Sequence, residues 1–192
     1  MGGKTQAAVE PSGYLGDMND FQEEQLAKLK EMYVQDDSHK LNPWMDDMFL
    51  LRFLRFKKFD ANDTFIMLNN FLDWRKAEGI DTILTDWEFP EKDAVMKAYP
   101  KGFFGTTKQG RPFWVENLGV IDAKGLFEAS DMDRLKRRHY CLYEEMIKLR
   151  FPACSLEYGR QISRTFSILD LKGMPWSALW NDKSKKILNE MS

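Results

Sequence analysis

Cysteine is scarce in this chain of 192 residues, and long apolar runs are absent from it. Cys141 and Cys154 are too few for a disulfide framework, which favours a reducing compartment. No apolar run approaches the roughly 20 residues of a transmembrane helix, and no signal peptide is recognisable. A basic excess is also lacking, because 28 Lys and Arg face 30 Asp and Glu. This balance argues against a general nucleic-acid binder.

Residues typical of catalytic and metal sites are few. His39 lies in a polar stretch, and His139 lies on the apolar stripe of a predicted helix, where a core position is expected. Neither cysteine has a partner at metal-ligand spacing. A glycine-rich phosphate loop and a Gly-x-Ser-x-Gly motif are both missing. The sequence therefore predicts neither an enzyme nor a bound metal or cofactor.

Aromatic residues are abundant, at 14% of the chain, with 14 Phe and 6 Trp. Large apolar rings suit a deep binding pocket, but a dense core would use them equally well. Composition alone leaves both interpretations open.

The first half of the chain predicts helices. Residues 1–18 have the composition of a flexible tail. Residues 19–80 contain apolar residues at helical spacing, which predicts three helices. The helix starts are expected at Asn19, Pro43 and Asp60, and Gly79 is expected to end the third helix.

The second half predicts an α/β unit after a turn-rich stretch at residues 99–112. Strands are expected at 113–118 and 162–171, and helices at 130–151 and 176–191. Ser130 and Asp133 are expected to cap the longer helix, and Pro152 to stop it. This order predicts a parallel βαβ unit, and two strands are few for a parallel sheet. We therefore expect an N-terminal portion of a longer fold.

Three hydroxyl residues alternate along the second predicted strand. Ser163, Thr165 and Ser167 share one face of it. Buried hydroxyls need hydrogen-bond partners, which a polar ligand group or water would supply. A half-exposed strand face explains the pattern equally well.

A cationic run follows the second predicted helix. It consists of Arg52, Arg55, Lys57 and Lys58. Cations are favoured at a helix C-terminus, and an anionic headgroup site is the alternative explanation.

The segment Leu50–Asp60 reads LLRFLRFKKFD and resembles the LLRFLRARKFD signature of the CRAL-TRIO N-terminal helical domain. Further motifs follow in family order: Trp74-Arg75, residues 81–84, Tyr99-Pro100, 110–112, 116–119, 150–155 and 170–173. Within this family the chain resembles the Sec-fourteen-type phosphatidylinositol/phosphatidylcholine transfer proteins. The resemblance implies a mixed α/β fold, with an all-helical unit at 19–90 and an incomplete lipid-binding domain at 91–192.

The resemblance also implies a function. Proteins of this type take one phospholipid from a bilayer into an apolar cavity, which a mobile helix closes. Shielding acyl chains from water removes a cost of ~0.8 kcal/mol per CH₂. The implied role is phospholipid transfer that couples lipid supply to membrane trafficking, in the cytoplasm and transiently at Golgi or other endomembranes, without nucleic acid. The alternative is a scaffold that binds another hydrophobe or a partner protein without transferring lipid. For residues 1–192 alone, we expect poor transfer.

The choline-headgroup site of the family implies five residues here. Phe103 and Trp114 stand where the family has tyrosines, and Tyr143 matches a family tyrosine. Thr165 and Ser167 stand where the family has a serine and a threonine. An aromatic cage suits a quaternary ammonium, and hydroxyl donors suit a phosphate. Phe103 and Trp114 lack the phenol oxygens, so hydrogen bonds made through those oxygens are lost.

The inositol site of the family is matched by two cations. Lys57 and Lys58 correspond to its basic pair. They are expected to assist phosphatidylinositol binding, because adjacent ammonium groups neutralise headgroup phosphate.

Overall fold

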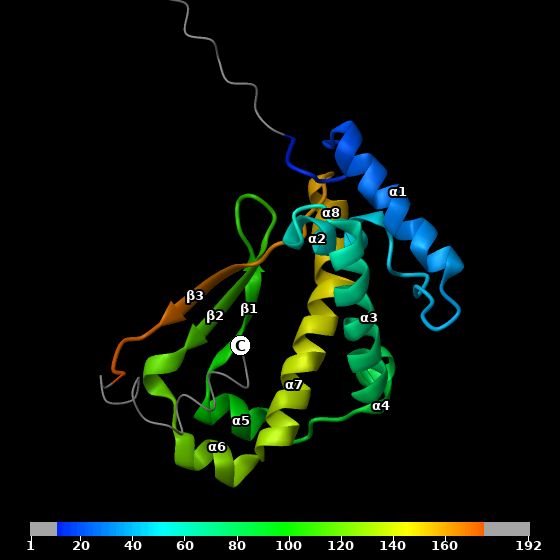
Figure 1. Cartoon of the computed structure of the whole chain (residues 1–192). Helices are drawn as coiled ribbons and strands as arrows, with labels where there is room; N and C mark the ends of the chain where they lie inside the picture. The colour runs from blue at the N-terminus through cyan, green and yellow to red at the C-terminus, as the bar shows by residue number, and fades with distance from the viewer. Residues whose placement is uncertain (1–10, 175–192) are drawn as a thin grey trace, which may run out of the picture. The chain divides into compact units, whose positions relative to one another are not determined.

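The computed structural model describes residues 11–174, which fall into two compact units on either side of the Gly79–Ile80 bond (Figure 1). Residues 80–90 group with the second unit, whereas the sequence predicts a domain boundary near residue 90. The helix predicted at 176–191 lies outside the described residues. The fold is mixed α/β, as predicted, with a helical first unit and a second unit of helices and one sheet.

The first unit consists of α1 (Asp20–Gln35), α2 (Asp47–Phe56) and α3 (Ala61–Ala77). Asn19 and Asp60 are the N-caps of α1 and α3, as predicted. The prediction that Pro43 begins α2 is wrong. The side chain of Asp46 accepts a hydrogen bond from the Phe49 amide at 2.9 Å and caps the helix there, because a carboxylate satisfies an amide that the first turn leaves free.

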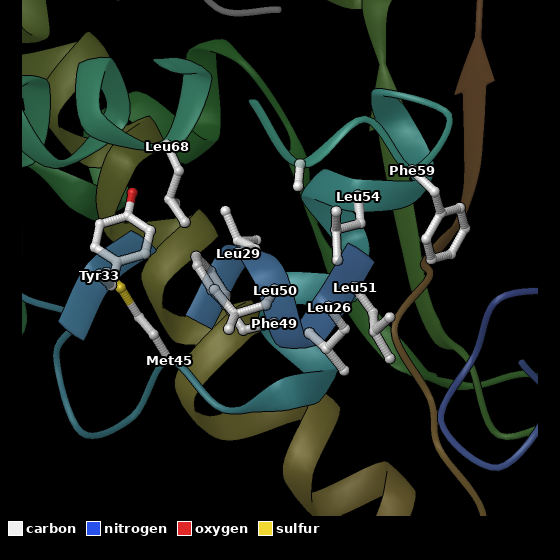
Figure 2. Close-up of a cluster of buried hydrophobic side chains, with 11 residues drawn as sticks. Leu26, Leu29, Tyr33, Met45, Phe49, Leu50, Leu51, Leu54, Phe59 and Leu68 are labelled. Carbon is white, nitrogen blue, oxygen red and sulfur yellow. The ribbon is translucent and has the colours of Figure 1, made fainter. Parts of the chain in front are cut away.

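A dense apolar core holds the three helices together (Figure 2). Leu29, Leu51, Leu54 and Leu68 are fully buried in it. Its buried members are Leu26, Leu29, Tyr33, Met45, Phe49, Leu50, Leu51, Leu54, Phe59, Ala61 and Leu68. Partly buried phenylalanines pack against them, so much of the aromatic content of this half serves the core rather than a pocket.

Part of the predicted flexible tail packs against α2. The Arg55 guanidinium donates to the Gly13 carbonyl at 3.0 Å and lies 3.9 Å from the Tyr14 ring centre. Gly13 has φ +69°, and a Cβ there would come within 2.5 Å of the Phe59 ring. Only glycine therefore fits this close approach.

The second unit contains a sheet in the order β1-β2-β3. The strands are β1 (Lys101–Thr106), β2 (Pro112–Asn117) and β3 (Phe166–Asp170). β1 pairs antiparallel with β2, and β2 pairs parallel with β3. The prediction of two strands is therefore wrong, because the turn-rich stretch contains β1 and the hairpin that joins it to β2.

Seven helical segments accompany the sheet. They are η1 (Ile80–Thr82), α4 (Ile83–Asp86), α5 (Lys92–Ala98), η2 (Leu118–Val120), α6 (Ala123–Ala129), α7 (Met132–Glu145) with its π-helical continuation η3 (Met146–Arg150), and α8 (Phe151–Tyr158). Within the described range, no helix is long and apolar enough to cross a bilayer.

The limits of the long helix differ from those predicted. Asp131, not Ser130, caps α7 by accepting from the Arg134 amide at 2.9 Å. The expected stop at Pro152 is also wrong. The π turn precedes Pro152 and places it in the first turn of α8, where a missing N–H is tolerated, and Gly159 ends the helix with φ +61°.

Candidate functional site

A cavity of about 420 Å³ is lined by one face of the sheet and by the helix α7–η3. Figure 1 shows the sheet and this helix in the second unit. The strands and the segments beside them contribute Tyr99, Lys101, Phe103, Trp114, Glu116, Leu118, Thr165, Ser167 and Leu169. The helix contributes His139, Leu142, Tyr143 and Met146. The five residues that the sequence comparison assigned to a choline headgroup thus line one cavity.

Phe103 and Trp114 form the aromatic part of the sheet wall. They are paired residues of β1 and β2, and their ring centroids are 4.8 Å apart at 68°. Tyr143 lies on the opposite wall, where its ring meets that of His139 edge to face at 4.8 Å. Tyr143 is 45% exposed. Aromatic rings therefore line the cavity on both walls, those of Phe103 and Trp114 from the sheet and that of Tyr143 from α7.

The two predicted hydroxyl residues lie at the β3 side of the cavity. Ser167 is paired with Trp114 in the parallel ladder, and Thr165 immediately precedes β3. Thr165 is half-buried and Ser167 is exposed. Neither hydroxyl has a hydrogen-bond partner within residues 11–174. The strand face is thus not a dry core, and both hydroxyls remain available to a polar group.

A partly buried carboxylate, that of Glu116, connects several residues that line the cavity. Glu116 accepts hydrogen bonds from the Tyr99 hydroxyl and, at 3.4 Å, from the Trp114 indole N–H. The Lys101 ammonium lies 3.6 Å from Glu116 and 4.1 Å from the Tyr99 ring centre. These contacts orient the Trp114 ring, since its indole N–H has an acceptor in Glu116.

Burial lowers the pKa of two groups in this cavity. The Lys101 side chain is 9% exposed, and burial lowers its pKa to about 8 against the opposing effect of Glu116. Burial, together with the positive charge of Lys101, lowers the pKa of His139 to about 4. His139 is therefore neutral at neutral pH, while burial and Glu116 raise the pKa of Tyr99.

Sequence reasoning did not assign Lys101, Glu116 or Tyr99 to the site. Lys101 shares a strand face with Phe103, which the family resemblance had assigned, so recognition of β1 would have pointed to Lys101 as well. His139 was expected to be a core residue, and it instead lines the cavity while keeping a buried environment.

The predicted inositol residues belong to the first unit. Lys57 is the C-cap of α2, and Lys58 follows it, exposed and with φ 52°. Arg52 and Arg55 of the same run contact the rings of Phe49 and Tyr14. The cavity lies wholly within the second unit, so the role of the two lysines stays a prediction.

Metal and redox chemistry have little support here. Among residues 11–174, no cluster of His, Cys, Asp or Glu could hold a metal ion. Cys141 and Cys154 are free and buried, and burial raises the pKa of both thiols.

The chain was compared with known proteins. No family model matches it. It is 42% identical over 146 residues to the phosphatidylinositol/phosphatidylcholine transfer protein SFH7 of Arabidopsis thaliana, a match that covers 76% of this chain and 26% of the relative. It is 38% identical over 169 residues to the SEC14 cytosolic factor of Kluyveromyces lactis, covering 88% and 56%. With the Sec14 cytosolic factor of Schizosaccharomyces pombe, it shares 36% identity over 164 residues, covering 85% and 56%.

These matches extend over most of the chain. The chain spans between about a quarter and just over half of the length of these relatives. The chain belongs to the family of Sec14-type phosphatidylinositol/phosphatidylcholine transfer proteins and matches an N-terminal portion of their CRAL-TRIO region.

Proposed function

We propose that the cavity of the second unit binds the headgroup end of a phospholipid in a protein that carries phosphatidylinositol and phosphatidylcholine between membranes. One observation carries this proposal. Phe103, Trp114, Tyr143, Thr165 and Ser167, which match the family's headgroup site, line a single cavity. They come from the three strands, from the segment just before β3 and from α7, so the fold brings together residues that are far apart in the sequence.

The chemistry of the cavity suits a zwitterionic or anionic headgroup. The two hydroxyls without partners can donate to phosphate oxygens. The rings of Trp114 and Tyr143 offer faces to a quaternary ammonium. No bond needs to be made or broken, so the proposed activity is transfer and not catalysis.

A lipid carrier must shield the acyl chains of its ligand from water. Moving them through water costs ~0.8 kcal/mol for each exposed CH₂, and an apolar enclosure removes that cost. Leu118, Leu142, Met146 and Leu169 already provide apolar lining beside the headgroup residues.

We further propose that Lys57 and Lys58 contribute to phosphatidylinositol binding. Lys58 is exposed, and both cations follow the apolar helix α2. The proposed setting is the cytoplasm, with transient docking on Golgi or other endomembranes, since two relatives are named cytosolic factors. The proposed partners are phospholipids and a membrane surface.

Native mass spectrometry of the purified chain tests lipid binding. Co-purified phosphatidylinositol or phosphatidylcholine supports the proposal, and a fluorescent-lipid assay between vesicles tests transfer. A different bound hydrophobe would favour the alternative of a scaffold. Transfer requires the complete protein as the reference, because the chain spans only part of its relatives.

A further inference from the structure

A second cavity, of about 310 Å³, lies in the same unit and shares part of its wall with the first. Lys101, Phe103, Trp114 and Leu142 line both cavities. The remaining wall comes from Gly102 of β1, from α5 and the segment before it, and from α7 and η3. The proposed headgroup site therefore has an adjoining compartment with which it shares the aromatic pair.

The second cavity has an excess of positive charge. Lys92, Lys101, Arg138 and Arg150 line it, against the single carboxylate of Glu145. Glu145 pairs with Arg138 at 2.9 Å. Lys101 pairs with Glu116 at 3.6 Å, on the side of the first cavity. Among residues 11–174, Arg150 and the more exposed Lys92 are then the lining cations without an anionic partner.

Arg150 is half-buried, and its buried Nε lacks the acceptor that a buried N–H requires. Its Nε is buried and has no hydrogen-bond partner, and its guanidinium carbon lies 4.1 Å from the Phe103 ring centre. Within residues 11–174, Arg150 forms neither an ion pair nor a hydrogen bond. Buried polar groups in proteins are nearly always satisfied, so an acceptor is missing at this position. The surrounding cations indicate that the missing acceptor is an anion.

The protein's own cations also occupy aromatic faces that choline would need. Arg150 covers a face of Phe103, and Lys101 covers a face of Tyr99. A ring face that already carries a cation attracts a quaternary ammonium less. An anionic group is therefore better suited to this end of the two cavities than a cation.

We propose that the second cavity binds a phosphate group, which Arg150 contacts through its fork of N–H donors with Lys101 and Arg138 beside it. Arginine suits this role because its planar guanidinium can donate two parallel hydrogen bonds to phosphate oxygens. The phosphate belongs either to the headgroup of a loaded phospholipid or to a free phosphate compound. Binding of a phospholipid phosphate rests on the proposed function, whereas binding of a free phosphate compound does not.

Arg150→Gln removes the positive charge of this one side chain. Arg150→Lys keeps the charge but lacks the planar guanidinium that donates two parallel hydrogen bonds. Arg160→Gln is the matched control, because Arg160 is exposed in the same unit and donates to the Gln109 carbonyl at 2.6 Å. The experiment has two arms. In the first, calorimetry with inorganic pyrophosphate measures the binding of a free phosphate compound. In the second, co-sedimentation with phosphatidylcholine vesicles, with and without phosphatidic acid, measures the binding of a lipid phosphate. Circular dichroism establishes that each variant is folded.

We expect Arg150→Gln to weaken binding about tenfold or more in at least one arm, which corresponds to the loss of charged hydrogen bonds. The affinity of Arg150→Lys should lie between those of the wild type and Arg150→Gln, and the affinity of Arg160→Gln should equal that of the wild type. An effect on pyrophosphate identifies a free phosphate compound, and an effect confined to phosphatidic acid vesicles identifies a lipid headgroup. Equal binding by the wild type and Arg150→Gln in both arms would overturn the site.

A second measurement does not depend on any variant. The Arg150 Nε–H resonance of the wild-type chain should shift on titration with pyrophosphate or with micellar phosphatidic acid, and an unchanged resonance in both titrations would contradict the site. The same experiments distinguish a failure of the proposed function from a failure of the phosphate site. A chain that carries no lipid but binds pyrophosphate through Arg150 would disprove lipid transfer and leave the phosphate site in place.

Discussion

Phe103 and Trp114 face each other across the β1–β2 ladder, and their rings meet at 4.8 Å and 68°. Each ring contacts a different polar group, because Arg150 lies on Phe103 and Glu116 accepts from the Trp114 indole at 3.4 Å. The pair lines both the proposed headgroup cavity and the cationic one.

Removing the Trp114 ring should reduce phosphatidylcholine loading. Trp114→Ala deletes a wall of the cavity and a face for the ammonium group, whereas Trp114→Phe keeps a ring of similar placement. We expect a severalfold loss for the alanine variant and a small one for phenylalanine, measured by native mass spectrometry. Equal loading by Trp114→Ala and the wild type would show that choline does not use this wall.

The hydroxyls of Thr165 and Ser167 should matter for phosphatidylcholine. The double variant Thr165→Val with Ser167→Ala removes two donors that lack partners within residues 11–174. Two lost hydrogen bonds to a charged group predict at least a tenfold drop in phosphatidylcholine loading. Thr106→Val on β1, which does not line the cavity, is the control. A drop of the same size in the control would point to a general effect on the sheet.

Charge reversal at Lys57 and Lys58 should lower phosphatidylinositol transfer by the complete protein and spare phosphatidylcholine. The reason is that two cations of the proposed inositol site become anions. The same reversal at exposed Lys28 and Lys40 is the matched control. Equal loss of both transfer activities, with the fold intact, would contradict this role.

Core leucines of the first unit should dominate its stability. Leu51 and Leu54 are fully buried, so Leu51→Ala or Leu54→Ala should lower the free energy of unfolding by about 2–5 kcal/mol. Val34→Ala changes a side chain that is 86% exposed, and its effect should stay within about 0.5 kcal/mol. Urea denaturation followed by circular dichroism measures both.

His139 should make the second unit less stable in acid. Burial lowers its pKa from 6.5 to about 4. The folded state therefore disfavours the protonated ring, and its contribution to stability is complete above pH 6.5 and lost as the pH falls towards 4. His139→Gln, which does not titrate, should reduce the loss of stability between pH 6.5 and 4 in urea denaturation.

His39 provides the contrast for that measurement. Its pKa is raised, chiefly by a hydrogen bond to Asp73, so its contribution is lost as the pH rises. His39→Gln should therefore leave the acid-side loss in place. An identical pH profile for His139→Gln and the wild type would count against a buried, neutral His139.

The sequence determined those helix starts at which a side chain accepts a hydrogen bond from a backbone amide in the first turn. Asn19 and Asp60 each cap the helix that follows, and this needs only a polar side chain just before the first turn. The Pro43 prediction failed because Asp46 offers a better cap a few residues later. The resemblance to the family also singled out five residues that line one cavity in the structure.

The tertiary structure decided which of these residues meet. β1 was missed because its stretch carries Gly102, Gly105 and Gly110, and local composition favours turns there. Its hairpin with β2 puts Lys101 and Phe103 on the cavity side. No local pattern in the sequence marks Lys101 or Arg150 as a residue of a binding site. Burial and the absence of a partner for the Arg150 Nε among the described residues gave them their properties, because desolvation depends on packing that no local pattern records.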